Sequence, residues 1–257
     1  MVNLNHSVIC LDIGNSTSHF GVYENGILID QNRISSSLLI NCTNKVLNKY
    51  NFSKFSLSYC SVLPEAEKSL LKYINKKNIN FFNLNYKTTV NFPINYPRPS
   101  QIGQDRLANS FAVFHSYDLP CLVIDIGTAT TFDVVSKNGG YEGGIIVPGP
   151  QGLLDFLNQN TALLPKVSIQ EKTSNIIIGK DTKQAMLIGA KLGYKSMNEG
   201  LISHLTKEIK LQFLKKPKLI LTGGASIETS FPYMEHRPEL TIFGLALAFQ
   251  CNKSNRS

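Results

Sequence analysis

The sequence predicts an α/β protein built from two related halves, and three observations support this fold class. A segment near the start of the chain recurs, with the same internal spacing, near its middle. Each copy is followed by alternating strand-like and helix-like segments, which is the pattern of α/β folds. Of the 257 residues, 42% are apolar and 17% are charged, so the halves have enough apolar side chains to form a core.

The recurring segment reads CLDIGNSTSHFGVYENG over Cys10–Gly26 and VIDIGTATTFDVVSKNG over Val123–Gly139. In both copies an apolar run ends in Asp-Ile-Gly, a hydroxyl-rich turn follows, and a second apolar run leads to Asn-Gly. Asn-Gly between two apolar runs is a strong β-hairpin signal. Each copy therefore predicts three strands, the third covering Ile27–Ile34 in the first half and Tyr141–Val147 in the second. The identical residues at one spacing favour a true repeat over two unrelated hairpins.

Helices and strands alternate after the first copy. We expect, in order, a helix over Ser37–Tyr50, a strand over Lys54–Val62, a helix over Pro64–Lys77 and a strand over Ile79–Leu84. The proline-rich segment Asn91–Gln101 predicts no regular element, and Gly103–His115 predicts a linking helix. The domain boundary is expected near Asp118, which gives an N-terminal domain of residues 1–117 and a C-terminal domain of residues 118–257.

The second half repeats this alternation. Pro148–Asn158 predicts the start of a helix, Asp181–Ile209 a long helix, Pro217–Leu221 a strand and Leu240–Cys251 an apolar helix. In the long helix, apolar residues on or near one face are expected to form the buried side: Ala185, Ile188, Leu192 and Met197.

Composition and charge exclude several classes of function. The net charge is +8, from 26 Lys and Arg against 18 Asp and Glu, but the basic residues are scattered, whereas nucleic-acid binding concentrates them. The five cysteines lack C-x-x-C spacing and are odd in number, which predicts free thiols in a reducing compartment. Asp12 interrupts the first apolar run, so we expect neither a signal peptide nor a membrane span. The prediction is a cytoplasmic protein without membrane or nucleic-acid partners.

Two Asp-x-Gly turns at strand ends predict a nucleotide triphosphate site between two domains. The glycine lets the backbone approach phosphate oxygens, and hydroxyl and amide donors follow each glycine: Asn15, Ser16, Thr17 and Ser18 in the first turn, and Thr128, Thr130 and Thr131 in the second. The aspartate suits a cation rather than a phosphate. One such turn alone would be an ordinary β-turn, whereas the pair favours phosphate binding. P-loop and G-x-G-x-x-G motifs are absent from the sequence.

Other motifs have two interpretations each. Glu142–Pro150 is a glycine-rich run into a helix start, where free N–H groups attract anions, or an ordinary turn, since glycine and proline also mark turns. Thr222-Gly223-Gly224 suits the close approach of a flat ring such as adenine, or an ordinary helix-entry loop. In the motif Gly103–Arg106, the acid could be a general base and the arginine could bind a carboxylate. In the other interpretation, Asp105 only stabilises the first helical turn through the helix dipole. His19 could touch a phosphate or pack inside the hairpin.

Six motifs follow one another along the chain: Asp12–Ser16 (DIGNS), Tyr96 with Pro99, Gly103–Arg106 (GQDR), Asp125–Thr131 (DIGTATT), Gly143–Gly149 (GGIIVPG) and Thr182 within DTKQA, with Gly189 after it. In this order they resemble the motifs of type III pantothenate kinases, members of the acetate kinase/Hsp70/actin superfamily. The resemblance extends from Asp12 to about Gly244. It implies two duplicated ribonuclease H-like domains of the actin-like ATPase class with a nucleotide cleft between them.

The resemblance also implies an activity and a role for each site residue. The activity is ATP-dependent phosphorylation of pantothenate to 4'-phosphopantothenate, the first step of coenzyme A biosynthesis, with Asp105 as general base, in a homodimer. The residues implied to bind ATP are Asp12, Ile13, Gly14, Asn15, Ser16, Thr17, Ser18, His19 and Thr128. Those implied to bind pantothenate are Tyr96, Gly103, Gln104, Asp105, Arg106 and Thr182, with Thr182 acting from the neighbouring subunit. Asp125 would hold a monovalent cation (K⁺ or NH₄⁺), and Asp12 would lie near the Mg²⁺ that accompanies ATP.

The chain departs from the family pattern at two positions. Gln104 replaces a small residue, commonly alanine, and is expected to narrow the substrate entrance. Asp181 replaces a common asparagine and adds negative charge near a carboxylate substrate. Three other functions are weighed against this one: a kinase of the same superfamily acting on a sugar or an acid, a non-catalytic regulator on the same fold, and direct nucleic-acid binding. The three aspartates Asp12, Asp105 and Asp125 favour catalysis, and the substrate motifs favour pantothenate.

Overall fold

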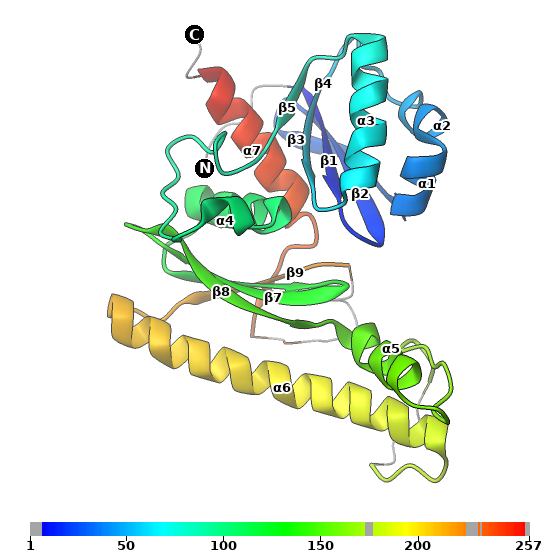
Figure 1. The fold of residues 1–257 in the computed structure, drawn as a ribbon. Coiled ribbons are helices and arrows are strands. Elements are labelled where there is room, and N and C mark those ends of the chain that lie inside the picture. The colour runs from blue at the N-terminus through cyan, green and yellow to red at the C-terminus, as the bar shows by residue number, and fades with distance from the viewer. Residues whose placement is uncertain (1–6, 173–176, 225–230, 232, 255–257) are drawn as a thin grey trace. The chain divides into compact units, whose positions relative to one another are not determined.

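The computed structural model describes residues 7–172, 177–224, 231 and 233–254, and within them it forms two five-stranded sheets flanked by helices (Figure 1). The first sheet has the strand order β3-β2-β1-β4-β5, and the second has the order β10-β9-β6-β7-β8. Read in the opposite direction, the second sheet has its five strands in the same relative order as the first. The duplicated α/β fold class that the repeat predicts is confirmed.

The elements follow the predicted alternation. The strands are β1 (Val8–Ile13), β2 (Thr17–Glu24), β3 (Ile27–Ser35), β4 (Ser56–Ser61), β5 (Phe81–Asn83), β6 (Cys121–Ile126), β7 (Ala129–Ser136), β8 (Gly140–Pro148), β9 (Lys218–Thr222) and β10 (Glu235–His236). The helices are α1 (Ser36–Asn41), α2 (Thr43–Leu47), α3 (Pro64–Lys77), the 3₁₀ helix η1 (Pro99–Gln101), α4 (Gln104–Ser116), α5 (Pro150–Asn160), α6 (Thr182–Phe213) and α7 (Leu240–Ser254).

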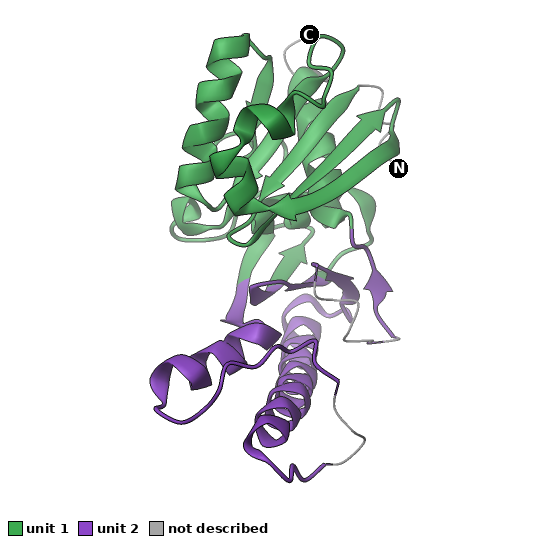
Figure 2. Ribbon diagram, turned by 90° about the vertical axis from the view of Figure 1, so that its right-hand side faces the viewer, with its two compact units in different colours: residues 1–121, 133–143, 239–257 green, residues 122–132, 144–238 purple. Residues whose placement is uncertain are grey.

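Contacts divide the chain into two compact units (Figure 2). Unit 1 comprises residues 1–121, 133–143 and 239–257, and unit 2 comprises residues 122–132 and 144–238. Helix α7 belongs to unit 1 because it packs on α4 and on β1, so the last segment of the chain completes the unit that the first segment begins. The expected boundary between residues 117 and 118 concerns the duplicated halves and stays a prediction.

The sheet of unit 1 has one apolar face, and Asp12 lies on the other face. Ile9, Leu11 and Ile13 of β1 belong to the core cluster that includes residues of α1, α2 and α3. Because side chains of a strand alternate between faces, Cys10 and Asp12 lie on the opposite face. That face packs on α7, as the hydrogen bond from Ser58 Oγ to Leu245 O (2.9 Å) shows. Asp12 therefore lies on the α7 side of the sheet.

The local predictions are mostly confirmed, with four corrections. The proline-rich segment Asn91–Gln101, which predicts no regular element, ends in the 3₁₀ helix η1. The first Asn-Gly forms the expected tight turn, with φ of 50° at Asn25 and 82° at Gly26, but in the second copy the positive φ lies one residue later, at Gly140. The expected helix over Ser37–Tyr50 is divided at Cys42, whose φ of −132° is not helical. The expected buried face of α6 was wrong. The residues that α6 buries are Met186, Leu187, Ala190, Tyr194, Asn198, Ile202 and Ile209, whereas Ala185 and Leu192 are exposed.

The contact between α4 and α7 supplies a test of the packing in unit 1. A Cβ built at Gly244 would lie 2.0 Å from the backbone oxygen of Ala108, so any side chain there must separate the two helices. Gly244→Ala should lower the free energy of unfolding by about 2 kcal/mol, measured by denaturant unfolding. The matched control is Gly200→Ala in α6, where the added Cβ meets nothing within 4 Å, and it should keep or raise stability. Equal stabilities of the two variants would contradict this packing.

Candidate functional site

The first Asp-x-Gly turn, between β1 and β2, is held rigidly from within unit 1. Gly14 N donates to Thr17 O (3.1 Å), and a Cβ at Gly14 would lie 2.8 Å from the same oxygen. From the start of α1, Ser36 Oγ donates to Gly14 O (2.7 Å) and Ser36 N donates to Ser16 O (3.0 Å). Asn15, Ser16 and Thr17 are exposed, so this turn presents polar groups on a fixed backbone.

Two of the residues expected to bind ATP are buried beneath this turn. Ser18 Oγ lies 2.9 Å from Ser36 Oγ, and His19 Nε2 lies 3.3 Å from the Gln31 side-chain oxygen. Burial, reinforced by the positive charge of Arg33, lowers the pKa of His19 to about 4. The imidazole is therefore neutral at neutral pH and brings no positive charge to a phosphate. Contacts of Ser18 and His19 with ATP stay predictions.

Asp12 faces the end of the neighbouring parallel strand. Asp12 and Cys60 are register partners in the β1–β4 pairing, and the Cys60 thiol donates to Asp12 Oδ1 (3.4 Å). Burial, followed by the negative charge of Asp12, raises the pKa of Cys60 well above its ordinary value, so the thiol keeps its proton. Sequence reasoning did not single out Cys60 for the site, and only the strand register places it there.

Asp105 lies in the first turn of α4, in unit 1. Its Oδ1 accepts a hydrogen bond from Arg106 N (2.8 Å) and would lie 2.5 Å from a Cβ at Gly103, so the carboxylate folds back over the residue that caps the helix. Burial raises the pKa of Asp105, while the hydrogen bond and charge of Arg106 oppose that rise. A carboxylate with a raised pKa is a better proton acceptor.

Arg106 is engaged by a buried carboxylate that sequence reasoning did not assign to the site. Arg106 Nε and Nη2 lie 2.9 and 2.6 Å from Asp133 Oδ1, and Tyr141 Oη donates to the same oxygen (3.0 Å). The Arg106 guanidinium lies 5.7 Å from the centre of the Tyr141 ring, and the Tyr96 ring packs on Tyr141 edge to face at 5.8 Å. The predicted substrate residues Tyr96 and Arg106 thus share one cluster. The signal that could have found it is the lone aspartate inside the apolar strand TFDVV.

The side chain of Gln104 is turned toward the sheet. Its Oε1 accepts from Ser61 N (2.8 Å) and from Asn83 Nδ2 (3.1 Å). The expected narrowing of a substrate entrance by this side chain stays a prediction, but its carboxamide oxygen already has two donors within unit 1.

The second Asp-x-Gly turn lies in unit 2 and is held by different contacts. Gly127 N donates to Ala129 O and Gly149 N donates to Thr128 O, both at 3.0 Å. Thr130 Oγ1 lies 2.7 Å from Tyr194 Oη of α6, and both groups are buried. Thr128 is exposed, so of these two threonines Thr128 presents its hydroxyl, while Thr130 fixes the strand on α6.

The glycine turn after β9 packs directly on Asp125. Gly223 has a φ of +99°, and a Cβ there would lie 2.3 Å from Ile126 O and 2.5 Å from Asp125 Oδ1. Only glycine fits this position, because a side chain would enter the space occupied by the carboxylate. The structure thus gives Gly223 a packing role against β6, whereas the adenine contact stays a prediction for this motif.

Asp181, one of the two departures from the family pattern, caps α6. The Asp181 side chain accepts from Gln184 N (2.8 Å), and Gln184 Oε1 accepts from Lys180 N (3.1 Å). This is close to the reciprocal arrangement of a capping box, and negative charge is favourable at a helix N-terminus. Thr182 follows as the first helical residue and is exposed.

Single carboxylates, rather than a closed cluster, are available for cations. Among residues 7–172, 177–224, 231 and 233–254, no three His, Cys, Asp or Glu side chains are grouped closely enough to hold a metal ion by themselves. Asp12 and Asp125 nevertheless supply carboxylate oxygens at the two turns, and hard cations such as Mg²⁺ are held by one or two carboxylates together with substrate phosphates and water. The donor set fits a cation that arrives with a nucleotide.

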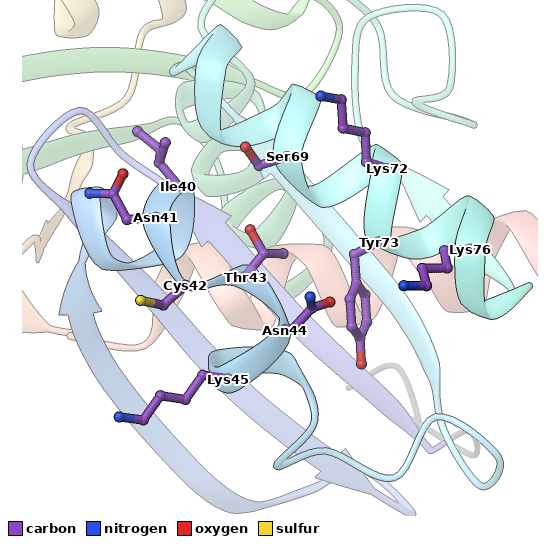
Figure 3. Close-up of a pocket in the computed structure, with 10 residues that line it drawn as sticks. All are labelled: Ile40, Asn41, Cys42, Thr43, Asn44, Lys45, Ser69, Lys72, Tyr73 and Lys76. Carbon is purple, nitrogen blue, oxygen red and sulfur yellow. The ribbon is translucent and has the colours of Figure 1, made fainter.

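A groove on unit 1, with a volume of about 500 Å³, contains none of the predicted site residues (Figure 3). It lies between α1, α2 and α3 and is lined by Ile40, Asn41, Cys42, Thr43, Asn44, Lys45, Ser69, Lys72, Tyr73 and Lys76. The lysine side chains lie along its rim and point in different directions (Figure 3). Within the described part of the chain, no helix is both long and apolar enough to cross a bilayer.

Known proteins resemble this chain in sequence, and solved structures resemble it in fold. A sequence model of the type III pantothenate kinase family matches residues 8–204. A type III pantothenate kinase from Sulfurihydrogenibium sp. (strain YO3AOP1) is 38% identical over 231 residues, which cover 84% of this chain and 88% of that protein. One from Listeria monocytogenes serotype 4a (strain HCC23) is 32% identical over 265 residues, covering 96% of this chain and 98% of that protein.

A solved structure from Campylobacter jejuni, described as a conserved Baf family transcriptional activator, superimposes with a TM-score of 0.59. It is 20% identical and covers 96% of this chain and all of that chain. At this level of identity the likeness shows the fold alone.

The buried imidazole beneath the first turn predicts a pH-dependent stability. Because the pKa of folded His19 is about 4 and its ordinary value is 6.5, the unfolded chain binds the extra proton first, and stability falls as the pH drops from about 6.5 toward 4. His19→Gln should reduce that fall by up to about 3 kcal/mol, measured by denaturant unfolding at several pH values. The exposed His204→Gln variant should keep the wild-type pH dependence. An unchanged pH dependence in His19→Gln would show that His19 is not buried in its neutral form.

Proposed function

The chain belongs to the type III pantothenate kinase family, and from this premise we propose that Asp105 is the general base of its reaction. The enzyme is an ATP-dependent kinase that phosphorylates pantothenate in coenzyme A biosynthesis, and its substrates are ATP and pantothenate. The observation that carries the assignment of the base is the position of Asp105 at the start of α4 with a pKa raised by burial.

The reaction requires one proton acceptor and precise alignment. The primary hydroxyl oxygen of pantothenate forms a bond to the γ-phosphorus of ATP, while the bond from that phosphorus to the leaving ADP oxygen breaks. Phosphoryl transfer depends mainly on positioning and on neutralising charge. The Asp105 carboxylate takes the hydroxyl proton as the new bond forms, and its raised pKa matches that task.

The phosphates of ATP are proposed to contact the two Asp-x-Gly turns. In the first turn the exposed Asn15, Ser16 and Thr17 offer donors on a backbone fixed by Ser36, and in the second Thr128 offers an exposed hydroxyl. Asp12 would hold Mg²⁺ together with the nucleotide, and Asp125 would hold a monovalent cation, K⁺ or NH₄⁺. When bound, these cations neutralise the charge that develops on the phosphate oxygens.

Pantothenate is proposed to contact Tyr96, the Gly103–Arg106 turn and Thr182. Tyr96 and Arg106 both pack on the ring of Tyr141 in one cluster of unit 1. Asp133 neutralises part of the Arg106 charge and holds its guanidinium in one orientation, so the remaining N–H groups are pre-organised for a polar substrate. The side chain of Thr182 is exposed in unit 2, as a contact made with a neighbouring subunit requires.

The proposed homodimer has support on the surface of α6. Ala185, Gly189, Leu192 and Gly193 are exposed on this helix, and a Cβ built at Gly189 or Gly193 meets no described atom within 4 Å. Small residues allow a second chain to approach the helix backbone closely, and Thr182 begins the same helix.

Removing the proposed base supplies the first test of this function. Asp105→Asn keeps the size of the side chain but cannot accept the proton, so kcat should fall by about two orders of magnitude or more while ATP affinity changes little. The pH profile of kcat should lose its acidic limb, which in the wild type lies above the ordinary aspartate range. Exposed Asp30→Asn on β3 is the matched control and should remain active. Near-normal turnover of Asp105→Asn would overturn the assignment.

The cation role of Asp125 is tested by the same assay under different salts. Pantothenate-dependent ADP production should require K⁺ or NH₄⁺ and should be low in Na⁺ or in the absence of both cations. Asp125→Asn removes the carboxylate charge and should raise the K⁺ concentration needed for half-maximal rate by at least about tenfold. A variant with the wild-type K⁺ dependence would place the monovalent cation elsewhere.

A further inference from the structure

We propose that Gln104 is a positioning residue that anchors the catalytic turn of α4 to the free end of β4. The proposal rests on the proposed role of Asp105 and deepens it. It gives the Gln104 side chain a role in holding the turn, whereas the resemblance placed this residue in the substrate-binding turn and predicted a narrower substrate entrance. The relevant residues all belong to unit 1.

The anchor exists because β4 is longer than its neighbour β5. The paired residues are Leu57 with Phe81, Ser58 with Phe82 and Tyr59 with Asn83, so Cys60 and Ser61 extend beyond the last residue of β5. Leu57 N donates toward β5, to Asn80 O (3.0 Å). Amides of alternate residues point to the same neighbouring strand, so Ser61 N also points to the β5 side, where the ladder has ended.

Gln104 supplies the acceptor that the missing strand would have provided. Its Oε1 accepts from Ser61 N at 2.8 Å, and the same oxygen accepts from Asn83 Nδ2 at 3.1 Å. A carboxamide oxygen has two lone pairs and can satisfy both donors. Ser61 is only 8% exposed, so losing the acceptor would leave a buried N–H unpaired, which is costly.

The first turn of α4 has no side-chain cap, and it is held by Arg106 through Asp133 on one side and by Gln104 on the side of β4. Its N-cap is Gly103, which has no side chain, and α4 has no side-chain cap hydrogen bond. Gln104 is the first helical residue and Asp105 the second, so a shift of this turn moves the Asp105 carboxylate directly. A displacement of about 1 Å at a reacting group can cost about a hundredfold in rate.

The same strand end also contacts the first phosphate turn. Cys60 donates to Asp12 Oδ1, and the next residue, Ser61, donates to Gln104. Hydrogen bonds from two consecutive residues of β4 thus connect Asp12 with the turn that carries Asp105. Glutamine suits this place because it accepts two hydrogen bonds without adding a negative charge beside two carboxylates.

Four variants of the full-length enzyme test the anchor. Gln104→Ala removes the acceptor, and kcat at saturating substrates should fall by about tenfold to a hundredfold, with KM for ATP changed less than about threefold. Asn83→Ala removes one donor and should have a smaller effect. Gln104→Glu restores an acceptor, so its kcat should recover at high pH, while its added charge should shift the acidic limb of the pH profile upward. Exposed Gln101→Ala removes a nearby glutamine that makes no such contact and should leave kcat unchanged.

A double-mutant cycle distinguishes a shared anchor from independent effects. Because Gln104 and Asn83 act through one contact, Gln104→Ala/Asn83→Ala should be no slower than Gln104→Ala alone. Multiplying effects would overturn the shared anchor. A Gln104→Ala enzyme with normal kcat, whether or not its melting temperature drops, would overturn the positioning role. If Gln104→Ala does not fold, the rate of Asn83→Ala and the pH shift of Gln104→Glu decide instead.

The outcome for Asp105→Asn separates this inference from the proposed function. An inactive Asp105→Asn together with a fully active Gln104→Ala would reject only the anchor. An active Asp105→Asn would reject the base itself, whatever the Gln104 variants do.

Discussion

The parallel pairing of β1 with β4 is the constraint on which the site in unit 1 depends. It places Asp12 opposite Cys60 and brings both strands to an end at the same edge of the sheet. Carboxyl ends of parallel strands are common positions for ligand sites in α/β folds because the loops that follow them meet there. The first Asp-x-Gly turn follows β1, and the turn that carries Asp105 is held by the last residue of β4.

The buried carboxylate of Asp133 is paired with a cation of the same unit. Asp133 is fully buried and receives Arg106 and Tyr141 on one carboxylate oxygen. Removing one partner of such a pair leaves an uncompensated charge and is strongly destabilising. The two contacts of the Arg106 guanidinium with Asp133 also hold Arg106 in one orientation. Asp105, the residue before Arg106, accepts a hydrogen bond from Arg106 N, and burial raises its pKa despite that contact. Of these adjacent residues, Arg106 is a fixed cation and Asp105 is the proposed proton acceptor.

Much of the fold could be predicted from the sequence because its signals are local. The repeated Asp-Ile-Gly and Asn-Gly elements predict two related hairpins, and the matching strand orders of the two sheets confirm the duplication. The order of helices and strands was also predictable. Errors arose where local patterns are ambiguous: the buried face of α6 is set by what packs on it, and the break at Cys42 lies in a segment of weak helix formers.

What the sequence determined by itself was the family, the duplicated fold and the residues placed at the two turns, because these depend on motif order and on short-range turn chemistry. Only the tertiary structure decided which polar side chains make internal hydrogen bonds that support the turns and which are exposed. Ser18 supports the first turn through Ser36, and His19 is buried against Gln31 of β3. Thr130 lies within hydrogen-bond distance of Tyr194 of α6, and Asp133 joins the cluster of Arg106. The physical reason is that hydrogen bonds such as Gln104 to Ser61 join residues far apart along the chain, and no local pattern specifies which distant partner a polar side chain will meet.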